Sequence, residues 1–359
     1  MAESKPVVSK VEMPSKVVRI EDGETSCQGR DQLVISFEGG TDAERFKQRA
    51  KVQKVIFLLR DDKRFVKYYE PRVVSLGPIH HGKEKYRLAE TFKHKLAKVF
   101  VERSQKTIKE ICEVIDGKIK ELRECFEEEV TKKYNDIDLT WILVVDGCAI
   151  LQYIDLAING TFKDHGIKND SVAFCQRDLF LLENQVPYLL LKLLMSLSNV
   201  EDELMNSVKE FIKINHQMVL RDESSDPKSG KQPENPTHLL DLPRSSLLGP
   251  ENKSHEAVAS NGGKKYRNKS SDWQSNGNVP ELKAAGIHVK PSRDNSLRGI
   301  YFDICLHLFP GRLWLPPLIV DDSTGPKLLN LIAYDMCLDF DNDFGITYDI
   351  RIFPRFNHR

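Results

Sequence analysis

Three polar residues that could do chemistry stand in the middle of the most apolar stretch of the sequence, residues 178–194. They are Glu183, Asn184 and Gln185, and Pro187 follows them closely. A carboxylate in apolar surroundings acquires a raised pKa, which is how proteins make general acids. The same side chains can instead hydrogen-bond the backbone groups that Pro187 leaves unpaired and tie this break to neighbouring segments. Because no second acid, nucleophile or histidine stands beside them, we favour the structural role.

Two adjacent histidines, His80 and His81, suggest a metal site. Adjacent side chains project in different directions, and no Cys, Asp or Glu cluster stands at ligand spacing nearby. We therefore expect imidazole-to-backbone hydrogen bonds in a turn, and no catalytic residue, metal or cofactor. Phosphate-binding loops, nucleophile elbows and zinc-protease helices are also absent from the sequence. The enzyme-class alternative is a hydrolase or small-ligand receptor that uses Glu183 with His80 or His81.

The composition describes a protein with a polar surface and no strong charge. Of 359 residues, 40% are hydrophobic and 30% charged, with 53 basic and 53 acidic residues. This balance gives no electrostatic reason to expect a nucleic-acid partner. The seven cysteines are scattered without a Cys-x-x-Cys pair, which favours reduced thiols in a cytosolic or nuclear setting. The first residues lack the apolar core of a secretory signal.

One apolar segment, Leu139 to Ile158, has about the length needed to cross a bilayer. Asp146, Gln152 and Asp155 interrupt it, and charges at that depth are costly, so we predict a helix buried inside the protein. Glycine is unfavourable within a helix, so Gly147 indicates a close helix contact or a small break there.

The spacing of apolar residues predicts further helices. Intervals of three and four residues occur in segments 41–59, 88–100, 108–126 and 201–220. Ser104 is expected to cap the third of these. Its regular stripe could also serve a coiled-coil partner, but packing on its own domain is the simpler interpretation.

The focal segment predicts a broken helix. Asp178 is expected to cap a helix that runs through Glu183, and Pro187 to end it, with a new helix beginning at Tyr188.

The predicted fold is mainly α, with a helical bundle-like core, a long disordered insertion and a small mixed α/β element near the C-terminus. The last element consists of a short helix at 280–287 that Gly286 ends, strand-like runs at 300–308 and 312–320, and a helix from Lys327. A basic cluster at 264–269 could be a nuclear-import or anionic-lipid patch, although a solvated linker is favoured. The expected boundaries are a disordered arm at 1–40, the core at 41–220, the mostly disordered insertion at 221–278 with a short anchor at 238–242, the α/β element at 279–337 packing on the core, and an atypical tail at 338–359.

Several long motifs resemble the plant family called domain of unknown function 247. The resemblance covers about residues 50 to 337, in the family's order. It is carried by Val74–Gly82, Asp146-Gly147-Cys148, Arg177–Pro187, His238–Leu242, Leu282–Ile287, Trp314–Leu318 and Leu329–Tyr334.

The resemblance implies a plant protein that is mostly helical and has no established enzymatic activity. Such proteins usually end in a transmembrane helix and are thought to lie at the plasma membrane, and some grass members are linked to self-incompatibility. This chain departs from the family pattern after Tyr334, where it enters an Asp-rich tail, so we expect a truncated member that is cytoplasmic, with the plasma membrane as the alternative. We expect a non-catalytic interaction or recognition protein with an unknown protein partner; a non-functional fragment is a further alternative.

Overall fold

The computed structural model describes residues 50–63, 65–165, 175–217, 235–249, 279–292, 296–303, 311–317, 319, 323–337 and 346. All of them belong to one compact unit, Gln48–Arg359. The predicted arm at 1–40, the basic cluster at 264–269, most of the insertion and nearly all of the tail lie outside the described residues.

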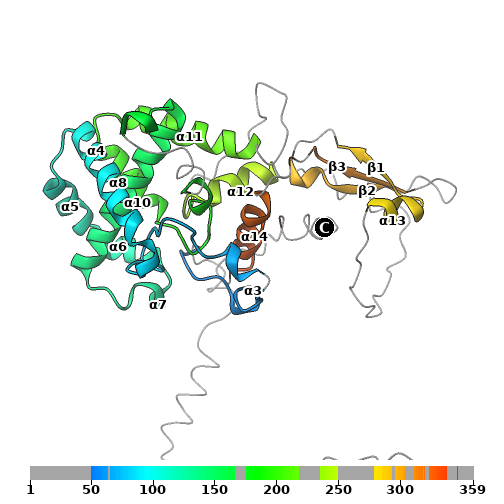
Figure 1. The fold of residues 1–359 in the computed structure, drawn as a ribbon, viewed down its shortest axis with the longest axis horizontal. Helices are drawn as coiled ribbons and strands as arrows, with labels where there is room; N and C mark the ends of the chain where they lie inside the picture. Colours follow the sequence, from blue (N-terminus) through cyan, green and yellow to red (C-terminus); the bar gives the residue numbers. More distant parts are fainter. Residues whose placement is uncertain are drawn as a thin grey trace, which may run out of the picture. The chain divides into compact units, whose positions relative to one another are not determined.

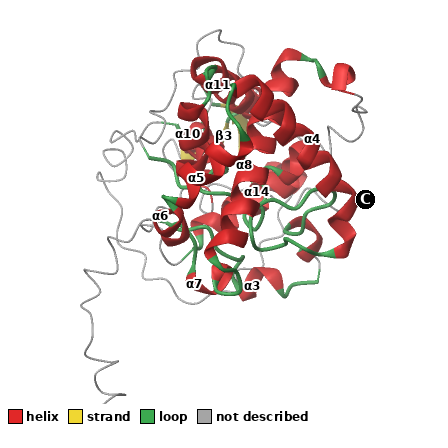
Figure 2. Cartoon of the chain, turned by 90° about the vertical axis from the view of Figure 1, so that its left-hand side faces the viewer, coloured by secondary structure: helices red, strands yellow, loops and turns green. Residues whose placement is uncertain are grey.

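The described chain is mainly helical, as predicted, with a small sheet near its C-terminal end (Figures 1 and 2). Its helices are α3 (Phe57–Arg60), η1 (Val66–Tyr68), η2 (Glu84–Tyr86), α4 (Arg87–Ser104), α5 (Ile108–Asp116), α6 (Ile119–Glu124), α7 (Glu128–Thr131), α8 (Asp136–Asn159), η3 (Phe162–His165), α10 (Tyr188–Leu197), α11 (Glu201–Gln217), α12 (Asp241–Leu248), α13 (Val279–Ala284), η4 (Leu297–Gly299) and α14 (Thr324–Asp335).

Helix α8 is the centre of the core. Asn135 caps its start by accepting a 2.8 Å hydrogen bond from the Asp138 N–H, and Gly160 ends it with a left-handed φ of 69°. Every residue from Thr140 to Leu156 is buried except Trp141, because α4, α5, α10 and α11 pack around it. This confirms the predicted buried helix. By length and composition α8 also qualifies as a membrane-crossing helix, but 83% of its apolar window is buried inside the protein, as in a core helix.

The capping prediction at Ser104 is wrong. Ser104 is the last residue of α4, and Gln105 ends that helix with a φ of 54°. Thr107 caps α5 instead, in a capping box with Glu110. The cap comes later than predicted because Ser104 still belongs to α4. The stripe predicted for 108–126 is then divided at Gly117 into α5 and α6.

The helix predicted for 41–59 does not form over the described residues 50–56. Val52 pairs with Phe126 in a parallel bridge, in which the Val52 N–H donates to the Cys125 carbonyl at 2.8 Å. Only α3 is helical. The β-branched residues of this stretch favour the extended backbone, and the pairing with a distant segment overrides the helical spacing.

The small sheet has the order β1-β3-β2, formed by His288–Pro291, Arg312–Leu315 and Tyr301–Asp303. Strand β1 runs parallel to β3, and β2 runs antiparallel to it. Both predicted strand regions therefore contain a strand, whereas β1 was not predicted. Gly286 ends the preceding helix with a φ of 79°, as expected.

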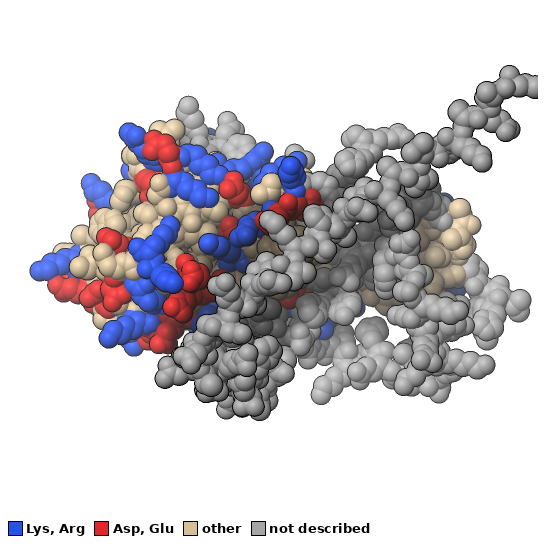
Figure 3. Space-filling model, turned by 90° about the horizontal axis from the view of Figure 1, so that it is seen from below, with Lys and Arg blue, Asp and Glu red and all other residues tan. Residues whose placement is uncertain are grey.

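The surface carries both signs of charge. Lys or Arg and Asp or Glu side chains are intermingled over the helical part of the face drawn in Figure 3. Many form exposed ion pairs in which both residues belong to the same helix, such as Lys109–Glu113 at 3.8 Å in α5. Pairs of this kind stabilise little, so the helices are held mainly by their buried faces.

Gly147 provides a test of the contact between α8 and α10. A Cβ atom there would lie 2.5 Å from Leu194 Cδ1 and 3.1 Å from Leu190 Cδ2, and both leucines are fully buried. We expect Gly147→Ala to lower the free energy of unfolding by about 1–2 kcal/mol, because overpacking outweighs the gain in helix propensity. Gly117→Ala is the control, since its Cβ would meet nothing closer than 3.5 Å, and should be neutral or slightly stabilising. Equal urea midpoints for the two variants would contradict this packing.

Candidate functional site

The candidate site is the buried segment of residues 178–187, which we call the polar junction. The helix predicted from Asp178 through Glu183 is absent: a helical turn at 175–178 ends at Asp178, and the chain continues in turns to Pro187. The Asp178 carboxylate does not cap a following helix. It accepts hydrogen bonds at 2.7–3.0 Å from the N–H groups of Arg72, Val73 and Val74. Burial raises the pKa of Asp178, while these three donors counteract the shift.

In the polar junction, two amide side chains supply hydrogen bonds that a helix or a strand would otherwise provide to the backbone. Asn184 donates to the carbonyls of Val74 and Asp178 and accepts from the Leu76 N–H at 2.7 Å. Gln185 donates to the carbonyls of Leu179 and Leu181 and accepts from the Leu240 N–H. Both side chains are at least 97% buried. The predicted role, which was to satisfy backbone groups and to tie the break to neighbouring segments, matches these contacts.

Glu183 and His80 meet inside the protein. Glu183 Oε1 accepts from the Val55 N–H at 3.0 Å, and Glu183 Oε2 lies 3.0 Å from His80 Nε2. His80 Nδ1 lies 2.8 Å from Lys83 Nζ. An ammonium group can only donate, so Nδ1 accepts and the ring proton is on Nε2, which lies beside the carboxylate without an aligned hydrogen bond to it. The predicted imidazole-to-backbone bond at His80 is therefore wrong, because a carboxylate distant in the sequence supplies the partner.

His81 is not part of this contact. Its ring lies edge-on to Tyr134, with ring centroids 6.2 Å apart. The structure thus brings together Glu183 and His80 from the enzyme-class alternative and leaves His81 aside.

A buried ion pair supports the turn that carries His80. Lys93 Nζ lies 2.6 Å from Asp146 Oδ1 and donates to the Ser75 carbonyl at 2.8 Å, while Asp146 Oδ2 accepts from the Gly77 N–H. Burial alone would lower the pKa of Lys93, but Asp146 and Glu90 outweigh it and raise the pKa, so the lysine stays charged. Lys93 was not predicted as a site residue, although its place on the apolar face of its helix is visible in the sequence.

The predicted anchor at 238–242 joins the polar junction and is longer than expected. The Tyr188 N–H donates to the Thr237 carbonyl at 2.9 Å, and Pro187 forms a bridge with His238. Helix α12 continues the ordered chain to Leu248, with Leu247 and Leu248 buried, so disorder predicted for 243–248 is wrong. The leucine pair buries this segment despite its polar composition.

Helix α14 closes the other side of the polar junction. Asn330 accepts from the Leu182 N–H at 2.8 Å and donates to the Tyr68 and Pro326 carbonyls. Asp335, at the end of α14, pairs with Arg244 of α12 at 2.7 Å. The last helix is therefore bound into the same network.

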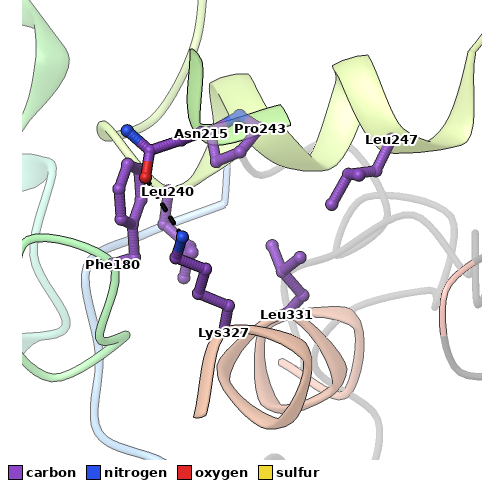
Figure 4. A pocket seen from close by; sticks show the side chains of 7 residues that line it. All are labelled: Phe180, Asn215, Leu240, Pro243, Leu247, Lys327 and Leu331. Carbon is purple, nitrogen blue, oxygen red and sulfur yellow. Dashed lines mark hydrogen bonds between the residues drawn. The ribbon is translucent and has the colours of Figure 1, made fainter. Parts of the chain in front are cut away.

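The burial of Glu183 and His80 limits the chemistry that these two residues can do. Two cavities of about 10 and 20 Å³ occur in the described core, each with room for about one water, and neither is lined by Glu183 or His80. Figure 4 shows the smaller cavity, where Lys327 of α14 reaches toward Asn215 of α11 at 3.1 Å. No group of three or more potential metal ligands is found among the described residues.

These features define a mainly helical protein whose described core is organised around a buried polar junction. The chain belongs to the family of plant proteins of unknown function called DUF247, which matches residues 52–348. This match extends beyond Cys337, near which we expected the family pattern to end.

A curated relative is the UPF0481 protein At3g47200 of Arabidopsis thaliana, which is 26% identical over 294 residues. The alignment covers 75% of this chain and 58% of the relative, so the chain spans less than two thirds of that protein's length. No solved structure matches the chain.

Gly77 tests how tightly the His80 turn is bound to the polar junction. Its φ is 67°, and a Cβ atom there would overlap the carbonyl oxygen of Gln185. Gly77→Ala should lower the free energy of unfolding by about 3 kcal/mol or more, because left-handed strain adds to a backbone clash. Gly82→Ala is the control, since Gly82 has a φ of 81° but no atom within 4 Å of the added Cβ, and should cost only about 1–2 kcal/mol. Similar losses of unfolding free energy for the two variants, measured by chemical denaturation, would contradict the contact between Gly77 and Gln185.

His238 predicts loss of stability in acid. Its ring is fully buried 4.5 Å from the Tyr334 ring, and burial lowers its pKa from 6.5 to about 3. The folded state therefore holds the neutral ring. Its stabilising contribution is complete above about pH 6.5 and is lost as the pH falls toward about 3, because the unfolded state takes up the proton first.

Between about pH 7 and about pH 5 the wild type should lose about 2 kcal/mol more stability than His238→Phe. Denaturation at each pH measures the difference between the two proteins, which cancels the contribution of other titrating groups. Parallel pH profiles would show that the ring is protonated in the folded state.

Proposed function

We propose that this chain is a non-catalytic interaction protein. The observation that carries the proposal is the closure of the Glu183–His80 contact. Both oxygens of Glu183 and both nitrogens of His80 already face protein atoms, and each side chain is less than 8% exposed. A general acid or base must reach the proton it transfers, and neither of the two cavities in the described core is lined by Glu183 or His80.

The surface supports the same proposal. Large apolar side chains are exposed on helices α4 and α8, among them Leu88, Ile137 and Trp141. Such side chains supply the contact area from which binding surfaces are built. The mixed charges of Figure 3 favour a protein partner over a polyanion.

A cytoplasmic location is part of the proposal. Cys112, Cys148 and Cys175 are free thiols in the described chain, which supports a reducing compartment. The plasma membrane and the self-incompatibility role that the resemblance implies are the alternatives for location and process.

The second candidate is a hydrolase or small-ligand receptor that uses Glu183 and His80. The 3.0 Å approach of these two residues favours it, because a paired imidazole and carboxylate is a common acid–base arrangement. In this reading a conformational opening would have to expose both residues.

Substitution of Glu183 distinguishes the two candidates. We expect Glu183→Gln and His80→Ala each to lower the free energy of unfolding by about 1–3 kcal/mol, because each leaves a buried group unpaired. His81→Ala, outside the contact, should change it by less than about 1 kcal/mol. Thermal denaturation gives the stabilities, and a panel of chromogenic ester, phosphate and glycoside substrates tests for turnover.

The interaction proposal expects no turnover by the wild type above the blank. A turnover that Glu183→Gln abolishes while the protein remains folded would establish the enzyme instead.

A further inference from the structure

Helix α3 presents two adjacent apolar side chains to solvent. Phe57 is 64% exposed and Leu58 is 65% exposed, and no residue of this four-residue helix is buried. The helix lies at the lower edge of the described helices in both ribbon views (Figures 1 and 2). Leu59 of the same helix packs against the core, whereas Phe57 and Leu58 face solvent. Single exposed apolar residues are common, but a neighbouring pair is a feature that a binding surface would explain.

The surroundings of this pair are basic. Residues 51–67 contain six lysines and arginines against two aspartates, in a chain whose net charge is zero. Lys54 and Lys63 are exposed and have no ion pair with another described residue, whereas Asp61 is already paired with Arg60 at 3.6 Å. In the sequence, therefore, exposed cations stand on both sides of the Phe57–Leu58 pair, where they complement an anionic surface.

The small area of the Phe57–Leu58 pair determines which class of partner can bind it. A stable protein–protein interface buries about 800 Å² on each partner, far more than two side chains offer. A lipid bilayer requires no such area, because a small apolar anchor and a few cations act together at its headgroup region.

We propose that Phe57 and Leu58 insert into the headgroup region of an anionic lipid bilayer, with Lys54 and Lys63 against its negative headgroups. This peripheral contact is independent of the interaction function proposed above. It also requires no membrane-spanning helix.

The test is cosedimentation of the full chain with vesicles of phosphatidylcholine, with and without phosphatidylserine. We expect binding only with phosphatidylserine, weakening as salt is raised. The double variant Phe57→Ser/Leu58→Ser should bind about 100-fold more weakly, from the lost transfer of two apolar side chains. Lys54→Glu/Lys63→Glu should bind at least about 10-fold more weakly. Phe57→Trp should show a blue-shifted emission on binding, relative to the wild type.

The matched control is Leu88→Ser/Ile137→Ser. These residues are 91% and 77% exposed on α4 and α8, and Asp136 and Asp138 flank Ile137, so vesicle binding should be unchanged. Because all the substituted side chains are exposed, the variants should keep the thermal midpoint of the wild type.

Three outcomes would overturn the proposal. One is equal binding of the wild type to vesicles with and without phosphatidylserine. Another is loss of binding in the lysine variant but not in the Phe57→Ser/Leu58→Ser variant, which would mean electrostatic adsorption without insertion. The third is a self-association of the wild type, measured by sedimentation, that the Phe57→Ser/Leu58→Ser variant abolishes without a change in vesicle binding. In that case a second copy covers the pair.

Discussion

A buried backbone that is neither helix nor strand must find hydrogen-bond partners elsewhere, and this constraint governs the polar junction. Asp178, Asn184 and Gln185 supply the carboxylate and amide groups that regular secondary structure would otherwise provide. Asn330 does the same from α14. Because these partners come from segments far apart in the sequence, their hydrogen bonds fix the packing of the whole core as well as the path of one loop.

The same requirement explains the polar residues of α8. Its composition is apolar enough for a membrane, yet its buried carboxylates face cations from α4: Asp146 pairs with Lys93, and Asp155 with Arg103. Removing one member of such a pair leaves an uncompensated buried charge, which is far more destabilising than removing both. The pairs therefore hold α4 and α8 in a single register, and the turn that carries His80 is bound to that register through Gly77.

The burial of the polar junction supports the proposed functions. Asp178, Asn184 and Gln185 satisfy backbone groups, and Glu183 and His80 are buried, which favours the surface as the part of the protein that binds a partner. Three of the long motifs that carry the family resemblance meet at the polar junction: Leu76 of Val74–Gly82, Leu240 of His238–Leu242 and Asn330 of Leu329–Tyr334 each hydrogen-bond it. The basic, apolar tip of α3 lies outside this network and is free to serve a separate contact.

The sequence alone was sufficient for features that depend on near neighbours. The helices α4, α8 and α11, the start of α10 directly after Pro187 and the glycine that ends α13 follow from local spacing, capping and backbone geometry. Only the tertiary structure decided that Val52 pairs with Phe126, that Asp178 caps a distant segment, and that Glu183 meets His80 about 100 residues away. Each of these contacts satisfies a buried group with a partner brought close by folding, and local pattern carries no information about which distant partner that is.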